Sequence, residues 1–198
     1  MNKEILVLYY SQNGATKKLA QLIARGVESV GGVTARIRCV PKVSTLCEQI
    51  EASIPESGNP YVTKADLAEC IGLALGSPVR FGNMAASMKY FWDSTSEEWL
   101  SGTLIGKPAC VFTSSSSLHG GQESCLLSMM LPLLHHGMCL LGLPYSNSEL
   151  ITTTSGGTPY GVTHVAGLNS DWEISADEKA LALAQGKYLA ETALKLCK

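Results

Sequence analysis

The feature that most constrains the fold is an uninterrupted apolar run over residues 5–10, which ends in a polar, glycine-containing loop. A strand buried on both faces of a sheet has this pattern, because neither row of its side chains meets water. Leu19, Ile23 and Val27 then recur at helical spacing, and the pair Gly31-Gly32 predicts where a helix ends. The chain is therefore expected to begin as a strand, a loop and a helix.

The same unit recurs along the chain. Residues 33–40 alternate between apolar and polar side chains, as expected for a strand near a sheet edge, and apolar segments at 70–75, 109–113 and 138–143 each lead into a loop. Alternating strands and helices predict a parallel sheet with right-handed crossovers, since each crossover helix must cover a face of the sheet. We predict an α/β fold of five strands with helices on both faces, in a single domain over residues 1–198.

Three segments need separate interpretation. Residues 42–66 are polar and allow only a short helix around residues 46–52. A final amphipathic helix is expected over about residues 175–196, with Ser175 as its N-cap and Glu178 three residues later. The segment 145–172 is rich in Thr, Ser and Gly, and we expect a long loop with a functional or inter-subunit role.

Composition excludes several classes of function. The net charge is −2 and no run of Lys or Arg is present, so nucleic acid is not an expected partner. The most apolar stretch, residues 126–143, contains Pro132, two histidines and Gly137, which argues against a membrane span. The seven cysteines lack the short spacing of a metal site, and their odd number favours a reducing cytoplasm. His135 and His136 would point about 100° apart on a helix, so no metal site is expected.

Three loops should converge where the chemistry is expected, because parallel sheets bind ligands at the carboxyl ends of their strands. The first loop leads into a helix N-terminus and suits a dianionic phosphate, the second presents an aromatic ring and a cation on a rigid proline turn, and the third supplies hydroxyls. Simpler alternatives are an ordinary N-cap turn, a surface cation beside a core phenylalanine, and a solvated serine turn. The three loops comprise Ser11, Gln12, Asn13, Gly14, Ala15 and Thr16; Pro78, Val79, Arg80, Phe81, Gly82 and Asn83; and Ser114, Ser115, Ser116 and Ser117.

Other catalytic motifs are missing from the sequence. Residues 102–107 fail the spacing of a nucleotide phosphate loop, and no Gly-x-Gly-x-x-Gly occurs. His119-Gly120-Gly121 could form an esterase oxyanion loop, but the chain has no Gly-x-Ser-x-Gly nucleophile elbow. A hydrolase is therefore disfavoured.

Taken together, these motifs resemble those of the WrbA-type NAD(P)H:quinone oxidoreductases, a branch of the flavodoxin-like family. The resemblance implies a three-layer α/β sandwich with a five-stranded parallel sheet of order 2-1-3-4-5, FMN as cofactor, NAD(P)H and a quinone as substrates, and a homotetramer. It rests on Leu8-Tyr9-Tyr10-Ser11, Gly76-Ser77-Pro78-Val79-Arg80-Phe81-Gly82-Asn83-Met84, Gly120-Gly121-Gln122-Glu123, His135-His136-Gly137-Met138 and Gly156-Gly157-Thr158-Pro159-Tyr160-Gly161.

The resemblance also implies roles for particular residues. The first loop would hold the FMN phosphate, the second would border the isoalloxazine, and Ser114 to Ser117 would lie along the ring edge and ribityl chain. His135 would be the flavin-side catalytic histidine, although it could instead cap a helix C-terminus. Trp99, Phe81 and Tyr145 would lie on the substrate side. NAD(P)H would give hydride to flavin N5 and leave before the quinone enters, which is a ping-pong cycle.

Two departures and several alternatives qualify this interpretation. Residues 115–119 form a loop one residue longer than the family's Thr-Gly-Thr-Gly-Gly run, and Val79 replaces a frequent threonine. A flavodoxin-type electron carrier is an alternative, but such carriers are usually more acidic than this chain. A flavin-free scaffold and a related FMN or azo reductase are further alternatives.

Overall fold

The computed structural model describes residues 3–43, 55–56 and 58–197. The short helix expected around residues 46–52 lies outside the described residues. The elements, in chain order, are β1 (Glu4–Tyr9), α1 (Ala15–Glu28), β2 (Thr34–Cys39), α2 (Lys64–Glu69), β3 (Gly72–Pro78), α3 (Ala86–Asp93), α4 (Ser96–Leu100), β4 (Pro108–Ser115), α5 (Gln122–His135), β5 (Cys139–Leu140), α6 (Glu149–Thr152), β6 (Val162–Val165) and α7 (Ala176–Leu196).

The strands form one parallel sheet of order β2-β1-β3-β4-β5, which confirms the predicted order. The predicted number of strands was wrong, because a sixth strand, β6, pairs with β4. It lies within the segment 145–172, for which the sequence pattern predicts only a long loop, and α6 lies there too.

Two short strands share the place beside β4. β5 pairs with Pro108 and Ala109 at the beginning of β4, and β6 pairs with the end of β4 from Phe112 onward. The apolar segment 138–143 yields only a two-residue strand because the chain then turns away from β4, and Leu143 N donates to Pro159 O at 2.9 Å. The end of β4 therefore pairs with β6 and not with β5.

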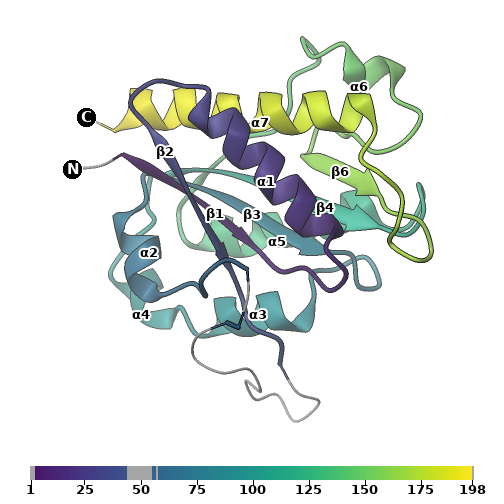
Figure 1. Cartoon of the computed structure of the whole chain (residues 1–198). Helices are drawn as coiled ribbons and strands as arrows, with labels where there is room; N and C mark the ends of the chain where they lie inside the picture. The colour runs from purple at the N-terminus through teal and green to yellow at the C-terminus, as the bar shows by residue number, and fades with distance from the viewer. Residues whose placement is uncertain (1–2, 44–54, 57, 198) are drawn as a thin grey trace.

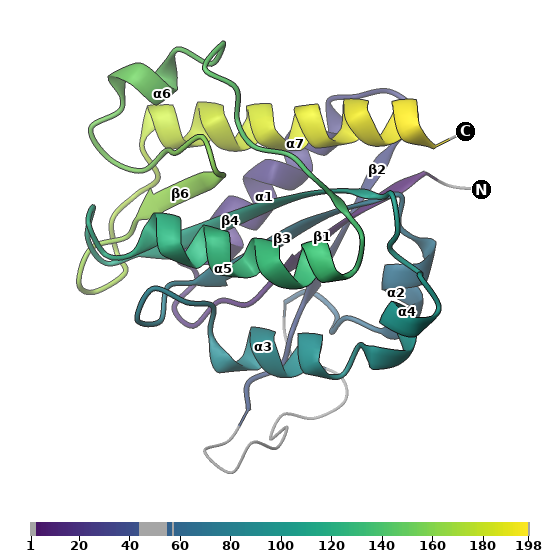
Figure 2. The same cartoon turned by 180° about the vertical axis from the view of Figure 1, so that it is seen from behind.

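The alternation of side chains along β1 explains its uninterrupted apolar run. Ile5 and Val7 pack with α1 and α7 on one face, whereas Leu6 and Leu8 pack with α3 and α5 on the other. Figure 1 shows α1 and α7 lying over one face of the sheet, and Figure 2 shows α3 and α5 over the opposite face. Both faces of β1 are therefore buried, as predicted.

The last helix begins as predicted. The Ser175 side chain accepts from Glu178 N and the Glu178 side chain accepts from Ser175 N, which is a complete capping box. α7 packs closely against α1 at Gly26. A Cβ at this position would lie 2.2 Å from Leu183 O, so a larger residue would not fit there. Within the described part of the chain, no helix is both long and apolar enough to cross a membrane.

Candidate functional site

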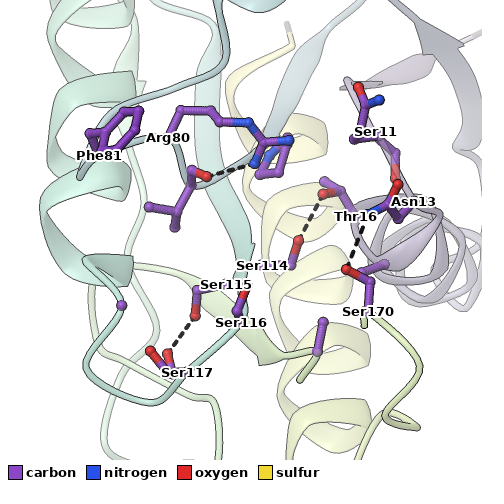
Figure 3. Close-up of a pocket in the computed structure, with 16 residues that line it drawn as sticks. Ser11, Asn13, Thr16, Arg80, Phe81, Ser114, Ser115, Ser116, Ser117 and Ser170 are labelled. Carbon is purple, nitrogen blue, oxygen red and sulfur yellow. Dashed lines mark hydrogen bonds between the residues drawn. The ribbon is translucent and has the colours of Figure 1, made fainter. Parts of the chain in front are cut away.

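A cavity of about 300 Å³ opens at the carboxyl edge of the sheet, and we call it the loop cavity. Four segments line it: the loop after β1, the turn after β3, the end of β4 with its following loop, and the loop after β6. Figure 3 shows these segments converging from separate elements. The lining residues are Ser11, Gln12, Asn13, Ala15, Thr16, Pro78, Val79, Arg80, Phe81, Ser114, Ser115, Ser116, Ser117, Gly120, Ala166 and Ser170.

The first segment brings the N-terminus of α1 to the cavity. Gly14 is the N-cap with φ 90°, a left-handed conformation that glycine adopts without strain, and no side chain caps the helix. The first-turn N–H groups of a helix have no intrahelical acceptor, so they are available to a ligand. The hydroxyl of Thr16 is buried at the cavity and lies 2.9 Å from that of Ser114.

The second segment is a tight turn with an exposed aromatic ring. Arg80 and Asn83 exchange backbone hydrogen bonds of 2.8 and 3.0 Å around Phe81 and Gly82, whose φ angles are 51° and 76°. Positive φ at both central residues defines a type I′ turn, and a bulky residue there is strained. The Phe81 side chain is fully exposed in the single subunit. The Arg80 guanidinium folds back to donate to Val79 O at 2.8 Å.

The third segment is fixed by α5. Ser115 Oγ donates to Ser117 O at 2.7 Å and accepts from Gln122 Nε2 at 2.8 Å. Gln122 is the first residue of α5 and is buried, so the helix start holds the serine loop in place.

Sequence analysis missed the fourth segment. Ala166 N donates to Ser115 O at 2.8 Å, and Ser170 Oγ accepts from Asn13 Nδ2 at 3.3 Å. The signal that could have revealed it is the short run of residues 162–165, three of which are β-branched, between Gly161 and Gly167; this pattern is typical of a strand followed by a turn.

Most of the predicted phosphate, ring and serine residues thus meet at one cavity. Gly14, Gly82 and Asn83 belong to the same loops but do not line it. Arg80 is the one cationic side chain among its lining residues. No group of three or more His, Cys, Asp and Glu side chains that could hold a metal ion occurs among the described residues.

The structure places His135 and Trp99 elsewhere. They line a second cavity of about 380 Å³, which we call the helix cavity, and it shares no lining residue with the loop cavity. Trp99 Nε1 donates to His135 O at 2.9 Å. Tyr145 lines neither cavity and is 60% exposed. The helix cavity is lined by Lys89, Trp92, Asp93, Thr95, Ser96, Trp99, Pro132, His135 and His136.

His136 forms the inner wall of the helix cavity. Its Nε2 lies 3.0 Å from Thr95 Oγ1, whose own hydrogen is donated to Trp92 O, so Nε2 carries the proton in this pair. Burial lowers the pKa of the imidazole, which keeps it neutral at neutral pH. The Trp92 ring packs edge-on against it at 5.2 Å between centroids.

Sequence comparisons identify similar proteins along the whole chain. Residues 4–150 match the family model described as NADPH-dependent FMN reductase. An NAD(P)H dehydrogenase (quinone) of Solidesulfovibrio magneticus is 39% identical over 97% of this chain and 98% of its own length. A protein of the same name from Geotalea daltonii is 41% identical over 98% of both.

Structural comparisons give the same fold. A flavodoxin, WrbA-like protein from Agrobacterium tumefaciens superposes with a TM-score of 0.69 at 22% identity, covering 98% of this chain and 99% of its own. A flavodoxin from the domain Archaea has a TM-score of 0.63 at 19% identity, covering 96% and 99%. At these identities the comparison supports the flavodoxin-like fold.

Proposed function

Because the chain belongs to the NADPH-dependent FMN reductase family, we propose that it binds FMN and transfers two electrons from NAD(P)H to quinones. The observation that carries the proposal is the convergence of a free helix N-terminus, a pair of hydroxyls and an exposed aromatic turn on the loop cavity. Each of these features matches one part of FMN.

The α1 end of the loop cavity fits the phosphate group. The N-terminus of α1 offers backbone N–H groups and the positive end of the helix dipole, both of which favour a dianion. Gly14 has no side chain, and no heavy atom lies within 4 Å of the place where a Cβ would be, so the space beside this part of the loop is open. Thr16 and Ser114 add hydroxyl donors. We propose that Ser11, Asn13 and Thr16 bind the phosphate.

The other end of the cavity fits a flat ring. The turn after β3 and the serine loop face each other across the cavity, with Val79 N donating to Ser114 O at 2.9 Å beneath them. We propose that Val79, Arg80 and Phe81 border the isoalloxazine, and that Ser115 to Ser117 lie along its edge. An exposed phenylalanine in a strained turn is explained if a ligand or a neighbouring subunit covers it.

Bound FMN supplies the hydride chemistry, so the side chains contribute mainly position and electrostatics. Backbone N–H groups and hydroxyls around the cavity stabilise negative charge on the ring. Arg80 lies on the ring side and contributes the one full positive charge of the lining. No lining residue needs to act as an obligatory acid or base. NAD(P)H and the quinone would use the same site in turn.

We further propose that the protein is a cytoplasmic homotetramer in which a neighbouring subunit brings Trp99, His135 and Tyr145 toward the FMN. Trp99 and Tyr145 are 51% and 60% exposed in the single subunit. The outer face of α5 carries Leu127, Leu131 and Leu134 at helical spacing, between 47% and 60% exposed, which is apolar surface that association would bury. The six cysteines within the described residues are free, which suits a reducing compartment.

The proposal is tested by mixing the protein with FMN, removing free flavin by gel filtration and recording the spectrum. Flavin should elute with the protein, and the loaded protein should oxidise NADH or NADPH much faster when benzoquinone is added. Protein prepared without FMN is the matched control. Retained flavin without quinone-dependent turnover would favour an electron carrier, and colourless protein would contradict the proposal.

A further inference from the structure

A buried, hydrogen-bonded pair of a histidine and a glutamate lies behind the loop cavity, and the proposed function does not use it. His164 in β6 and Glu178 in the first turn of α7 are joined by a bond of 2.8 Å between Nδ1 and Oε2. Both side chains are 1% exposed. A buried carboxylate and imidazole are costly to desolvate, so their contacts call for a physical explanation.

Glu178 is held as a carboxylate. It accepts from the backbone N–H groups of Gly156, Val165 and Ser175 at 2.8, 3.0 and 2.9 Å, besides the imidazole of His164. Burial alone would raise the pKa of Glu178, but these hydrogen bonds bring it below its usual value. An ionised Glu178 can only accept hydrogen bonds, so the proton between the two side chains is on His164 Nδ1.

The other ring nitrogen has no partner. His164 Nε2 is buried and makes no hydrogen bond to any described residue. An unpaired buried polar atom costs free energy in the ligand-free protein, and such atoms in native proteins usually serve a purpose. Ligand binding is one way for this nitrogen to acquire a hydrogen-bond partner.

His164 lies next to the phosphate end of the loop cavity. It pairs with Ser114 in the register of β6 and β4, and paired residues of parallel strands project from the same face of a sheet. Ser114 Oγ lies 2.9 Å from Thr16 Oγ1, and both residues line the cavity (Figure 3). His164, Ser114 and Thr16 therefore follow one another on one face of the sheet, and no hydrogen bond joins His164 Nε2 to Ser114 Oγ in this structure.

The residues that line the phosphate end of the loop cavity carry no charge. The lining residues near Thr16 are neutral, and Arg80 belongs to the turn after β3 that we assign to the ring. Neutral donors alone would face a phosphate of charge between about −1.5 and −2 in a partly desolvated site, where a nearby positive charge is strongly favourable. Lys17 lies with Ser11, Gln12 and Gly14 around a neighbouring cavity, and His164 is the buried residue that pairs with Ser114 in the sheet.

We propose that His164 takes up a proton from solvent at Nε2 when the phosphate group of FMN binds at Thr16 and Ser114. The resulting imidazolium donates to Ser114 Oγ, which turns its own hydrogen toward the phosphate, and Glu178 remains the counter-ion that holds the ring. His164 is a positioning residue, because it acts through Ser114. This inference rests on the proposed function, since it takes FMN as the ligand.

The surroundings of the ring contain few competing charges. α7 contributes Glu178, β4 contributes Ser114, and α5 contributes Gln122, which donates to His164 O at 3.3 Å. On α1 the buried side chains are Thr16 and apolar residues. Lys18 and Glu173 form a separate exposed ion pair at 3.1 Å. Proton uptake linked to the phosphate is therefore assigned to His164.

The test is calorimetric titration of the FMN-free protein with FMN at pH 7.5 in two buffers of different ionisation enthalpy, which counts protons taken up. Riboflavin, which lacks the phosphate, is the matched ligand, and His164→Gln is the matched variant, because Gln can still donate to Glu178. We expect roughly 0.3–1 proton taken up per FMN by the wild type, and none with riboflavin or in the variant. The Kd for FMN should then rise about twofold to tenfold per pH unit relative to His164→Gln.

Equal proton uptake for FMN and riboflavin, or in the wild type and His164→Gln, would overturn the inference while leaving FMN binding intact. If His164→Gln does not fold, ¹⁵N NMR of the wild-type histidine rings gives the answer. Both ring nitrogens of one buried histidine should be protonated with FMN but not with riboflavin, and an unchanged ring would overturn the inference. Protein that binds neither flavin would contradict the proposed function itself.

Discussion

The two cavities of this subunit are built in opposite ways. The loop cavity is made where the chain leaves β1, β3, β4 and β6, and its lining is rich in hydroxyls and backbone groups. The helix cavity is made by α3, α4, α5 and the residues joining them, and aromatic rings and imidazoles dominate its inner wall. A cavity at strand ends is fixed by the register of the sheet, whereas a cavity between helices depends on how they pack.

One helix joins the two regions. Gln122, at the beginning of α5, holds the serine loop of the loop cavity, and His135, at its end, lines the helix cavity. The inner face of α5 packs on the sheet, while its outer face exposes leucines. Changes along α5 therefore separate what the subunit needs to fold from what an assembly needs.

The largest effect is expected at Leu126, which is fully buried on the inner face of α5. Leu126→Ala should reduce the free energy of unfolding by about 2–5 kcal/mol, because it removes packed atoms and leaves a cavity. Leu127→Ala, at a 47% exposed neighbour, is the matched control and should cost less than about 0.5 kcal/mol in the isolated subunit. Urea unfolding measures both, and equal losses would contradict the orientation of α5.

The next effect concerns the phosphate end of the loop cavity. Thr16→Val should weaken FMN binding by about 1–2 kcal/mol, because it removes a hydroxyl donor while keeping the shape of the side chain. The Kd would rise about fivefold to thirtyfold in a fluorescence titration. Thr192→Val on α7, whose hydroxyl donates to Tyr188 O, is the control and should leave the Kd unchanged. An unaltered Kd in Thr16→Val would remove Thr16 from the site.

A smaller effect, of opposite sign, is expected at Phe81. Asn tolerates the left-handed conformation better than Phe, and an exposed ring loses little packing, so Phe81→Asn should stabilise the subunit by about 0.5–1 kcal/mol. The same change should weaken FMN binding or quinone turnover. Thermal unfolding of FMN-free protein measures the first effect. A destabilised variant would show that Phe81 is packed against something in the free protein.

The smallest effect on flavin binding is expected in the helix cavity. Trp99→Phe should change the Kd for FMN by less than about twofold, because Trp99 does not line the loop cavity. If a neighbouring subunit presents Trp99 to the substrate, the KM for benzoquinone should rise several-fold in steady-state assays. Sedimentation of the variant and the wild type at one concentration controls for a change of assembly. A large loss of FMN affinity would contradict the separation of the two cavities.

The parts that could be predicted from sequence depend on local pattern. The apolar run of residues 5–10 required a central strand, and Ser175 with Glu178 specified the beginning of α7. The loops after β1, β3 and β4 could be expected to meet, because parallel strands end at the same edge. β6 was missed because four residues carry too little periodicity to distinguish a strand from a loop.

The remaining features depend on tertiary packing. The resemblance assigned His135 to the flavin side, and nothing in the local sequence reveals that α5 carries it to a different cavity from Arg80 within one subunit. The hydrogen bond between His164 and Glu178 joins residues 14 positions apart, and only the pairing of β6 with β4 brings it behind Ser114.

The most direct test of the central claim is to follow the flavin spectrum of FMN-loaded protein under anaerobic conditions, first with NADPH and then with benzoquinone. Our account predicts that NADPH alone bleaches the bound flavin and that benzoquinone, added after the oxidised nucleotide has left, restores it. Flavin that NADPH and NADH both leave oxidised, or that bleaches but is not restored by the quinone, would contradict the account.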